Sequence, residues 1–139
     1  MNKMNKKNFA LVIFLCLFYM SCAGHKPTFK ETAYKTLSAA ATSYEQTMLA
    51  LGDYYKQGKI SEETKDKIIE AANVYWSAYH SAVLAFEVYE RSITMEGEQN
   101  KVKAKQQLDA ALNDLNKALL NFLEMSNDYL SRLKKIEKE

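Results

Sequence analysis

The amino-acid sequence predicts an all-α protein, an antiparallel up-down-up bundle of three long helices with heptad patterning. The chain of 139 residues holds only 4 glycines and 1 proline, too few for an all-β fold or a disordered chain. Apolar residues recur at alternating spacings of three and four over three segments, as they do in helices that pack side by side. The length suits one domain.

The first helix is expected over residues 28–57. Thr28 and Glu31 have the spacing of a capping box, and Gly58 is a natural C-terminal stop. Gly52 lies inside the helix and should weaken it by about 1 kcal/mol relative to alanine. The positions expected to face the core are Tyr34, Leu37, Ala41, Tyr44, Met48, Leu51 and Tyr55.

The second and third helices are expected over residues 61–95 and 98–137. Ser61 is the predicted N-cap of the second helix, and Gly97 marks the turn before the third. Short connections at these turns make successive helices antiparallel. The second core seam is Ile68, Ala72, Tyr75, Tyr79, Ala82, Phe86, Tyr89 and Ile93. The third is Leu108, Leu112, Leu115, Leu119, Phe122, Ser126, Tyr129, Leu133 and Ile136.

Folding the helices about their turns places small residues level with large ones. Ala82 comes level with Leu37 and Leu112. Ala72 comes level with Phe122. A core that alternates small and large side chains in this way fills without voids, so we expect no large internal cavity.

The first residues read as a targeting segment and not as part of the bundle. Three lysines precede an uncharged apolar run at residues 9–20. This run is shorter than the roughly 20 residues that a membrane-spanning helix needs, and it suits the apolar region of a signal peptide. Ser21 and Cys22 follow it directly.

The junction at Ser21 and Cys22 resembles the lipobox of bacterial lipoproteins, in which a small residue precedes an obligatory cysteine. The resemblance covers residues 1–22 alone, and Tyr19 stands where an aliphatic residue is usual. It implies cleavage between Ser21 and Cys22 and attachment of a diacylglyceryl group to the cysteine thiol. An ordinary secreted protein and an uncleaved anchor are the alternatives.

On this interpretation the chain divides into three parts. Residues 1–21 form a lipoprotein signal peptide, residues 22–27 a lipidated tether, and residues 28–139 the bundle. Several acyl chains, of the palmitate type, hold a protein on a membrane durably, whereas one chain holds it only marginally. The resemblance also favours the outer membrane, because Ala23 stands where some bacterial lipoproteins that stay in the inner membrane have an aspartate.

Cleavage would also change the composition of the chain. The full sequence has 19 basic and 17 acidic residues, and loss of Lys3, Lys6 and Lys7 leaves 16 basic ones. The slight basic excess therefore belongs to the signal peptide, and we expect no nucleic acid as partner. No cysteine follows Cys22, so the mature chain has no internal disulfide and no thiolate metal site.

Residues with catalytic potential are sparse. The two histidines, His25 and His80, lack a second ligand at the helical spacing that a metal site in a bundle favours. The motifs of serine hydrolases, zinc proteases and phosphate-binding loops do not occur. We therefore expect no enzyme, no cofactor and no metal.

Two groups of side chains are candidate contact surfaces. Apolar residues beside the seams either widen the core or contact a partner protein: Tyr54, Trp76, Leu123 and Leu130. Basic residues gather at the end expected to lie near the membrane: Lys26, Lys30, Arg91, Lys101, Lys103 and Lys105. Near anionic head groups each is worth about 1 kcal/mol, and a solvated surface neutralised by neighbouring acids is the alternative.

The sequence therefore predicts a non-enzymatic lipoprotein, anchored through Cys22 in the bacterial cell envelope and facing the periplasm or the exterior. It would act as a protein-interaction or structural module whose partner is another envelope protein or an external protein. The tyrosine-rich seams favour one alternative, a binding protein for a small apolar ligand or lipid held between the helices. A lipoprotein of a mobile element that interferes with envelope traffic is a third reading.

Overall fold

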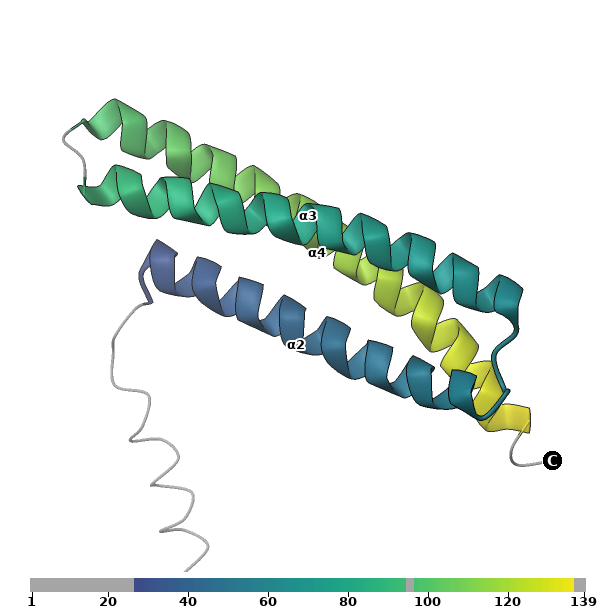
Figure 1. Ribbon diagram of the computed structural model, residues 1–139. Coiled ribbons are helices and arrows are strands. Elements are labelled where there is room, and N and C mark those ends of the chain that lie inside the picture. The colour runs from purple at the N-terminus through teal and green to yellow at the C-terminus, as the bar shows by residue number, and fades with distance from the viewer. Residues whose placement is uncertain (1–26, 95–96, 137–139) are drawn as a thin grey trace, which may run out of the picture.

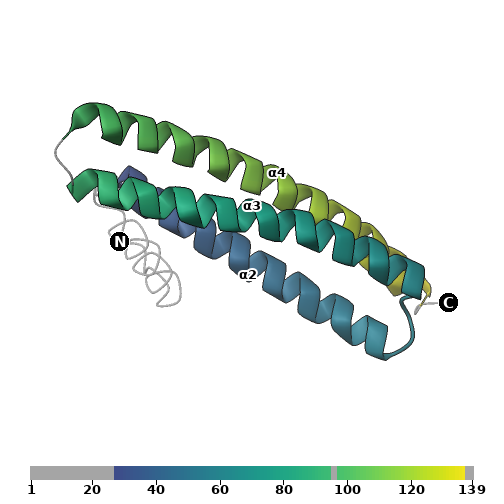
Figure 2. The same cartoon turned by 45° about the horizontal axis from the view of Figure 1, so that its top comes forward.

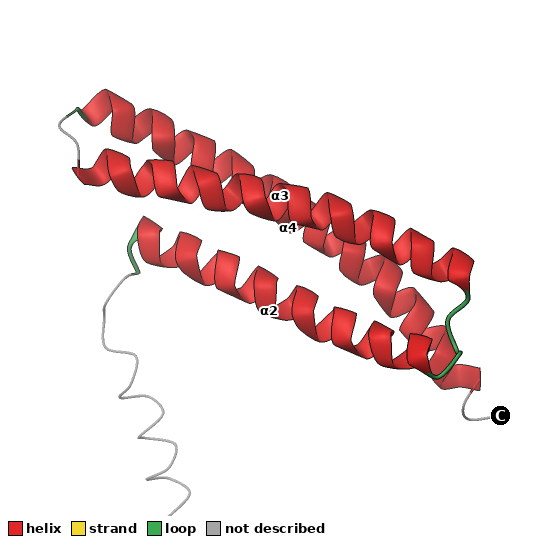
Figure 3. Ribbon diagram, in the orientation of Figure 1, coloured by secondary structure: helices red, strands yellow, loops and turns green. Residues whose placement is uncertain are grey.

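The computed structural model describes residues 27–94 and 97–136, with side chains as far as residue 133. This part consists of the helices α2 (Phe29–Lys56), α3 (Glu62–Thr94) and α4 (Glu98–Ile136). They lie side by side as an elongated rod in which α3 runs antiparallel to the other two (Figures 1 and 2). Within these ranges no strand occurs (Figure 3). The predicted all-α three-helix bundle is confirmed.

The helices begin and end where local sequence signals predict. The Thr28 N–H donates to Glu31 Oε2 at 2.8 Å, and the Glu31 N–H donates to Thr28 Oγ1 at 3.2 Å, which completes the capping box. At the start of α3, the Thr64 N–H donates to Ser61 Oγ at 3.3 Å. Gly58 has a φ of 70°, a left-handed conformation that glycine adopts without steric cost.

The core consists of two buried clusters along the rod. The cluster nearer the α3–α4 turn includes Leu37 and Ala82, with Leu112 packed against it. The cluster nearer the Gly58 turn includes Ala72 and Phe122. The residues predicted to lie level therefore belong to the same cluster in each case.

The predicted seam of the first helix is wrong near both of its ends. Tyr34 is 64% exposed and Tyr55 is 39% exposed, whereas Ala33 and Ala40 are buried. An α-helix drifts by about 20° per heptad relative to a strict seven-residue repeat, so a strict seam leaves the buried face over several turns. On α2, alanines occupy the buried positions instead, because little space remains between α3 and α4 there.

The second helix shows the same correction at its C-terminal end. Ile93 is exposed and the preceding Ser92 is buried. The Ser92 hydroxyl donates to the Tyr89 carbonyl at 2.7 Å, so burial leaves no unpaired polar group. The last predicted seam residue, Ile136, lies outside the side chains that the structure describes.

The three pairs of helices do not pack equally closely. The interface between α3 and α4 is the most extensive of the three. Small residues repeat every seven positions and are buried or half-buried on both helices: Ala71, Ala78 and Ala85 on α3, and Ala104, Ala111 and Ala118 on α4. Small side chains let helix backbones approach closely. Pairs of aromatic rings separate α2 from α3 instead, with Phe29 against Tyr89 at 5.0 Å and Tyr44 on Tyr75 at 4.4 Å between centroids.

Candidate functional site

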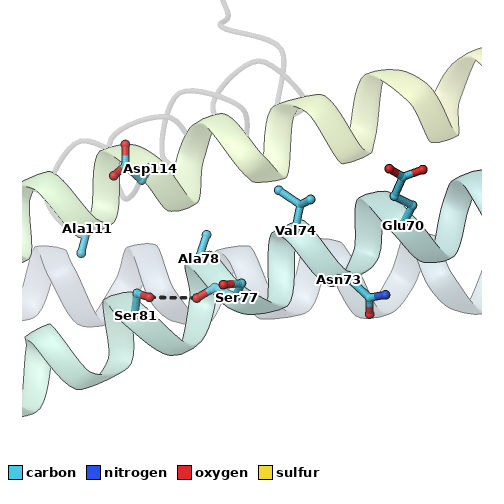
Figure 4. Close-up of a pocket in the computed structure, with 8 residues that line it drawn as sticks. All are labelled: Glu70, Asn73, Val74, Ser77, Ala78, Ser81, Ala111 and Asp114. Carbon is cyan, nitrogen blue, oxygen red and sulfur yellow. Dashed lines mark hydrogen bonds between the residues drawn. The ribbon is translucent and has the colours of Figure 1, made fainter.

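The first candidate site is a shallow strip between α3 and α4, which we call the α3–α4 groove. It contains an open hollow of about 700 Å³ whose walls include Val74, Ala78 and Ser81 of α3 and Ala111 of α4 (Figure 4). Ala78 and Ala111 point toward each other's helix, and Val74 is 58% exposed. A second hollow follows along the same two helices, lined in part by Val88.

Sequence reasoning missed this groove, although a signal for it exists. Val74, Ser81 and Val88 are seven residues apart, so they form one line along α3. They flank a parallel line of alanines that faces α4. The side chains in both lines are small. They therefore stand out less in the sequence than the tyrosines and leucines of the core.

The second candidate site is a cavity of about 430 Å³ between α2 and α3, which we call the aromatic cavity. Its walls include the rings of Tyr44, Tyr75 and Trp76. The Tyr44 and Tyr75 rings stack with an interplanar angle of 6°. Trp76 stands nearly edge-on to Tyr44 at 5.3 Å, and its Nε1–H donates to the Tyr44 hydroxyl oxygen at 2.9 Å. The rings are therefore held in a fixed arrangement.

Two hydroxyls are buried in the core, one on Tyr75 of the aromatic cavity and one on Ser126 of α4. Tyr75 Oη and Ser126 Oγ have no hydrogen-bond partner within the described part of the chain. Burial, followed by the neighbouring Tyr79 and Tyr44, raises the pKa of Tyr75 to about 12. Tyr75 therefore stays protonated well above neutral pH.

Charge at the mouth of the aromatic cavity comes from Glu45. It is the only charged residue that lines the cavity within the described ranges. Glu45 is exposed and makes no ion pair with any described residue. Met48 and the 64% exposed Leu49 complete an apolar wall beside it. The cavity thus combines aromatic rings, apolar side chains and one unpaired negative charge.

The predicted partner residues separate into two places. Tyr54, Leu123 and Leu130 are half-buried and pack against the core cluster near the Gly58 turn. Trp76 is 42% exposed at the aromatic cavity. The structure therefore brings three of the four together and places the fourth on another part of the surface.

The predicted basic cluster lies largely beside acidic groups. Three of its members face carboxylates: Lys30 and Glu90 at 2.6 Å, Arg91 and Glu87 at 3.8 Å, and Lys101 and Glu98 at 4.0 Å. Lys105 Nζ lies 4.8 Å from the centre of the Phe29 ring, and Lys103 lines the second hollow of the α3–α4 groove. Lys26 lies outside the described residues. Exposed ion pairs of this kind leave little net charge for a distant partner.

An exposed polar triad ties α2 to α3 across their turn. The Tyr55 hydroxyl donates to Glu62 Oε1 at 2.6 Å, and Lys65 pairs with the same carboxylate. The hydrogen bond from Lys65, followed by that from Tyr55, lowers the pKa of Glu62. The bond to Glu62 in turn raises the pKa of Tyr55. Tyr55 therefore links the two sides of the turn by a hydrogen bond outside the core.

The remaining predictions fall on the first residues of the chain. Ser21, Cys22 and His25 lie outside the described residues, so cleavage and lipidation remain predictions. Among the described helices none is long and apolar enough to cross a membrane. No group of histidine, cysteine and acidic residues within residues 27–94 and 97–133 could hold a metal ion, and His80 lies exposed beside Trp76 at 5.6 Å between ring centres.

Comparison with known proteins identifies no relative. No protein-family model, curated protein or solved structure matches this chain. The chemistry of the two candidate sites is therefore the basis of any functional argument.

Proposed function

We propose that the protein is a lipid-anchored, non-enzymatic helical bundle of the bacterial cell envelope that binds another envelope or external protein. The anchor is Cys22, in its lipobox-like setting after an apolar run. The outer membrane is the proposed site of attachment. The observation that supports protein binding is the α3–α4 groove, an exposed strip in which Val74, Ala78 and Val88 lie among polar and charged side chains of both helices.

The shape of the groove favours a helix as the bound element. A partner helix that lays an apolar face into a groove contacts it at heptad spacing, and the spacing from Val74 through Ser81 to Val88 matches that repeat. The small side chains on the floor allow close approach of a second backbone. Covering an exposed apolar residue such as Val74 would contribute about 25 cal/mol to the binding free energy for each Å² of apolar surface removed from water.

The proposed anchor sets the orientation of the rod. The start of α2, the end of α3 and the start of α4 lie at one end (Figure 1), and only a short tether separates Cys22 from α2. This end would face the membrane, where Lys103 and Lys105 could contact anionic head groups. The Gly58 turn would lie at the far end, and the α3–α4 groove would extend between the two ends.

Site-specific photocrosslinking in native membranes tests the proposed groove. A photoreactive amino acid at Val74 or Val88 should capture one specific protein, and the same amino acid at Glu124, an exposed residue of α4, should not. The full-length chain should be used so that export and anchoring are retained. Capture of the same proteins from all three positions, or of none, would count against the groove.

The anchor is tested separately by the mass of the N-terminal peptide from native membranes. A peptide that begins at acylated Cys22 is the expected result. The Cys22→Ser variant should leave the membrane fraction. An unmodified peptide with another start would make the bundle a free secreted protein and would remove the orientation argued above.

A second candidate function is the binding of a small ligand between the helices. The aromatic cavity favours it, because concave sites lined by apolar groups with one or two polar groups are typical of ligand pockets. This function is compatible with the first, because the two sites lie on different sides of α3.

A further inference from the structure

We propose that the aromatic cavity binds an organic cation, an alkylated ammonium group, either as a free molecule or as the head group of a lipid. The site is formed by α2 and α3, whereas the protein-binding groove lies between α3 and α4. The inference names the ligand class of the second candidate function and rests on it, and it stands or falls apart from the proposed protein interaction.

The aromatic rings provide the first attraction for a cation. The faces of tryptophan and tyrosine rings carry negative electrostatic potential, and a cation within about 6 Å of a ring centre is attracted to it. Tyr44, Tyr75 and Trp76 all line the cavity, and Trp76 keeps 42% of its surface exposed. Part of the indole is thus open to a ligand.

The arrangement of these rings is fixed before a ligand arrives. The stack of Tyr44 on Tyr75 and the hydrogen bond from Trp76 to Tyr44 restrain all three side chains. A preformed site avoids the entropy cost of ordering side chains on binding. Tyr75 is buried beneath the stacked Tyr44 ring, so Trp76 and Tyr44 are the rings that can face a ligand, and Tyr75 supports Tyr44 from the core.

The negative charge of Glu45 favours a positively charged ligand. Glu45 of α2 has no ion-pair partner among the described residues, whereas four acids of α3 are paired: Glu62, Glu63, Glu87 and Glu90. No lysine or arginine lines the cavity within the described part of the chain. A bound cation would have both the carboxylate and the rings as partners, and an anion would be repelled by both.

The remaining walls indicate what the cation carries. Leu49 is 64% exposed and Met48 lies beside it on the same wall. Methyl or methylene groups on the nitrogen would cover these side chains, and the polarizable sulfur of methionine adapts to irregular ligands. The volume of about 430 Å³ suits a small ligand or a head group. Choline is a suitable probe of this chemistry.

The fluorescence of Trp76 reports on the site directly, because it is the only tryptophan of the chain. Full-length protein in a non-ionic detergent is titrated with choline at constant ionic strength. The comparison ligand is the neutral carbon isostere of choline, in which a tert-butyl group replaces the trimethylammonium group. Choline should change the fluorescence saturably, and the isostere should bind about tenfold more weakly, which corresponds to about 1.4 kcal/mol.

A matched pair of variants tests the role of the carboxylate. Glu45→Gln should weaken choline binding about fivefold. Glu124→Gln removes another exposed charge, on α4, and should leave the affinity unchanged. Far-UV circular dichroism of each variant verifies that the bundle is folded, and isothermal titration calorimetry repeats the comparison without relying on fluorescence.

Each outcome decides the proposal. Equal binding of choline and its neutral isostere would overturn it in favour of an apolar-ligand pocket. No saturable signal by either method, or equal affinity of Glu45→Gln and the wild type, would overturn it as well. Short-chain phosphatidylcholine and phosphatidylglycerol then distinguish the source of the ligand: binding of phosphatidylcholine supports a lipid head group, and binding of choline alone supports a free cation.

Discussion

Tyr75 shows how one side chain can fill the core and still carry an energetic cost. Its ring stacks on Tyr44 and approaches Phe122 at 6.3 Å between centroids. Its hydroxyl is buried without a hydrogen-bond partner in the described part of the chain, and such a group typically costs about 1–3 kcal/mol. The stack and the neighbouring ring offset this cost in the native bundle.

Tyr75→Phe should therefore raise the free energy of unfolding by about 1 kcal/mol. The ring contacts stay and only the unpaired hydroxyl is removed. Chemical denaturation of the variant against the wild type measures the change. Tyr34→Phe, on an exposed ring, is the control and should have no effect. A loss of about 1 kcal/mol in Tyr75→Phe would show instead that the hydroxyl has a partner, such as a buried water.

The raised pKa of the same hydroxyl predicts a loss of stability at alkaline pH. Burial raises the pKa of Tyr75 from 10.0 to about 12, so the unfolded chain loses this proton at a lower pH than the folded chain. Ionisation of Tyr75 therefore leaves the free energy of unfolding unchanged below pH 10 and lowers it as the pH rises toward about 12. Denaturation midpoints of the wild type and Tyr75→Phe should diverge over this range. Parallel curves would contradict the predicted shift.

At the scale of elements, α2 contains a glycine that the fold does not require. Nothing lies within 4 Å of a Cβ added at Gly52, and its conformation is helical. Gly52→Ala should therefore raise the free energy of unfolding by about 1 kcal/mol. Gly58→Ala should lower it by about 1 kcal/mol, because Gly58 has a φ of 70°. Thermal melts that shift in the same direction for both variants would contradict this account.

The boundaries of the elements could be predicted because their signals are local. The capping box of Thr28 and Glu31 lies within four residues, and Gly58 acts through its own backbone. The buried face of α2 was harder to predict because it depends on where α3 and α4 lie around it. Tyr34 and Tyr55 fit a heptad in the sequence, but the structure places them outside the core.

At the scale of the molecule, the unequal packing divides the bundle into a hairpin and an added helix. The backbones of α3 and α4 lie closest over the greatest length, and those of α2 and α3 over the least. Elements with fewer buried contacts open locally more often. We expect the amides of α2 to exchange hydrogen faster than those in the middle of α3 and α4. Equal protection in all three helices, measured by mass spectrometry, would indicate a single cooperative unit.

The candidate sites were less predictable than the fold for a related reason. The sequence leaves Trp76 either as a residue that widens the core or as an anchor for a partner, and its bond to Tyr44 joins residues of two helices and depends on their register. The α3–α4 groove depends on small residues, whose pattern carries little hydrophobic signal. Both sites arise from pairs of helices, and a single segment does not reveal them.

The placement of the two ends of the bundle has a mechanical consequence. The start of α2 and the end of α4 lie at opposite ends of the rod (Figure 1). Tension applied between them acts along the helix axes, so α2 and α4 would have to slide past each other in shear. Sliding strains all contacts between the helices at once, whereas sideways peeling breaks them one after another. A molecule held at these two points would therefore resist extension.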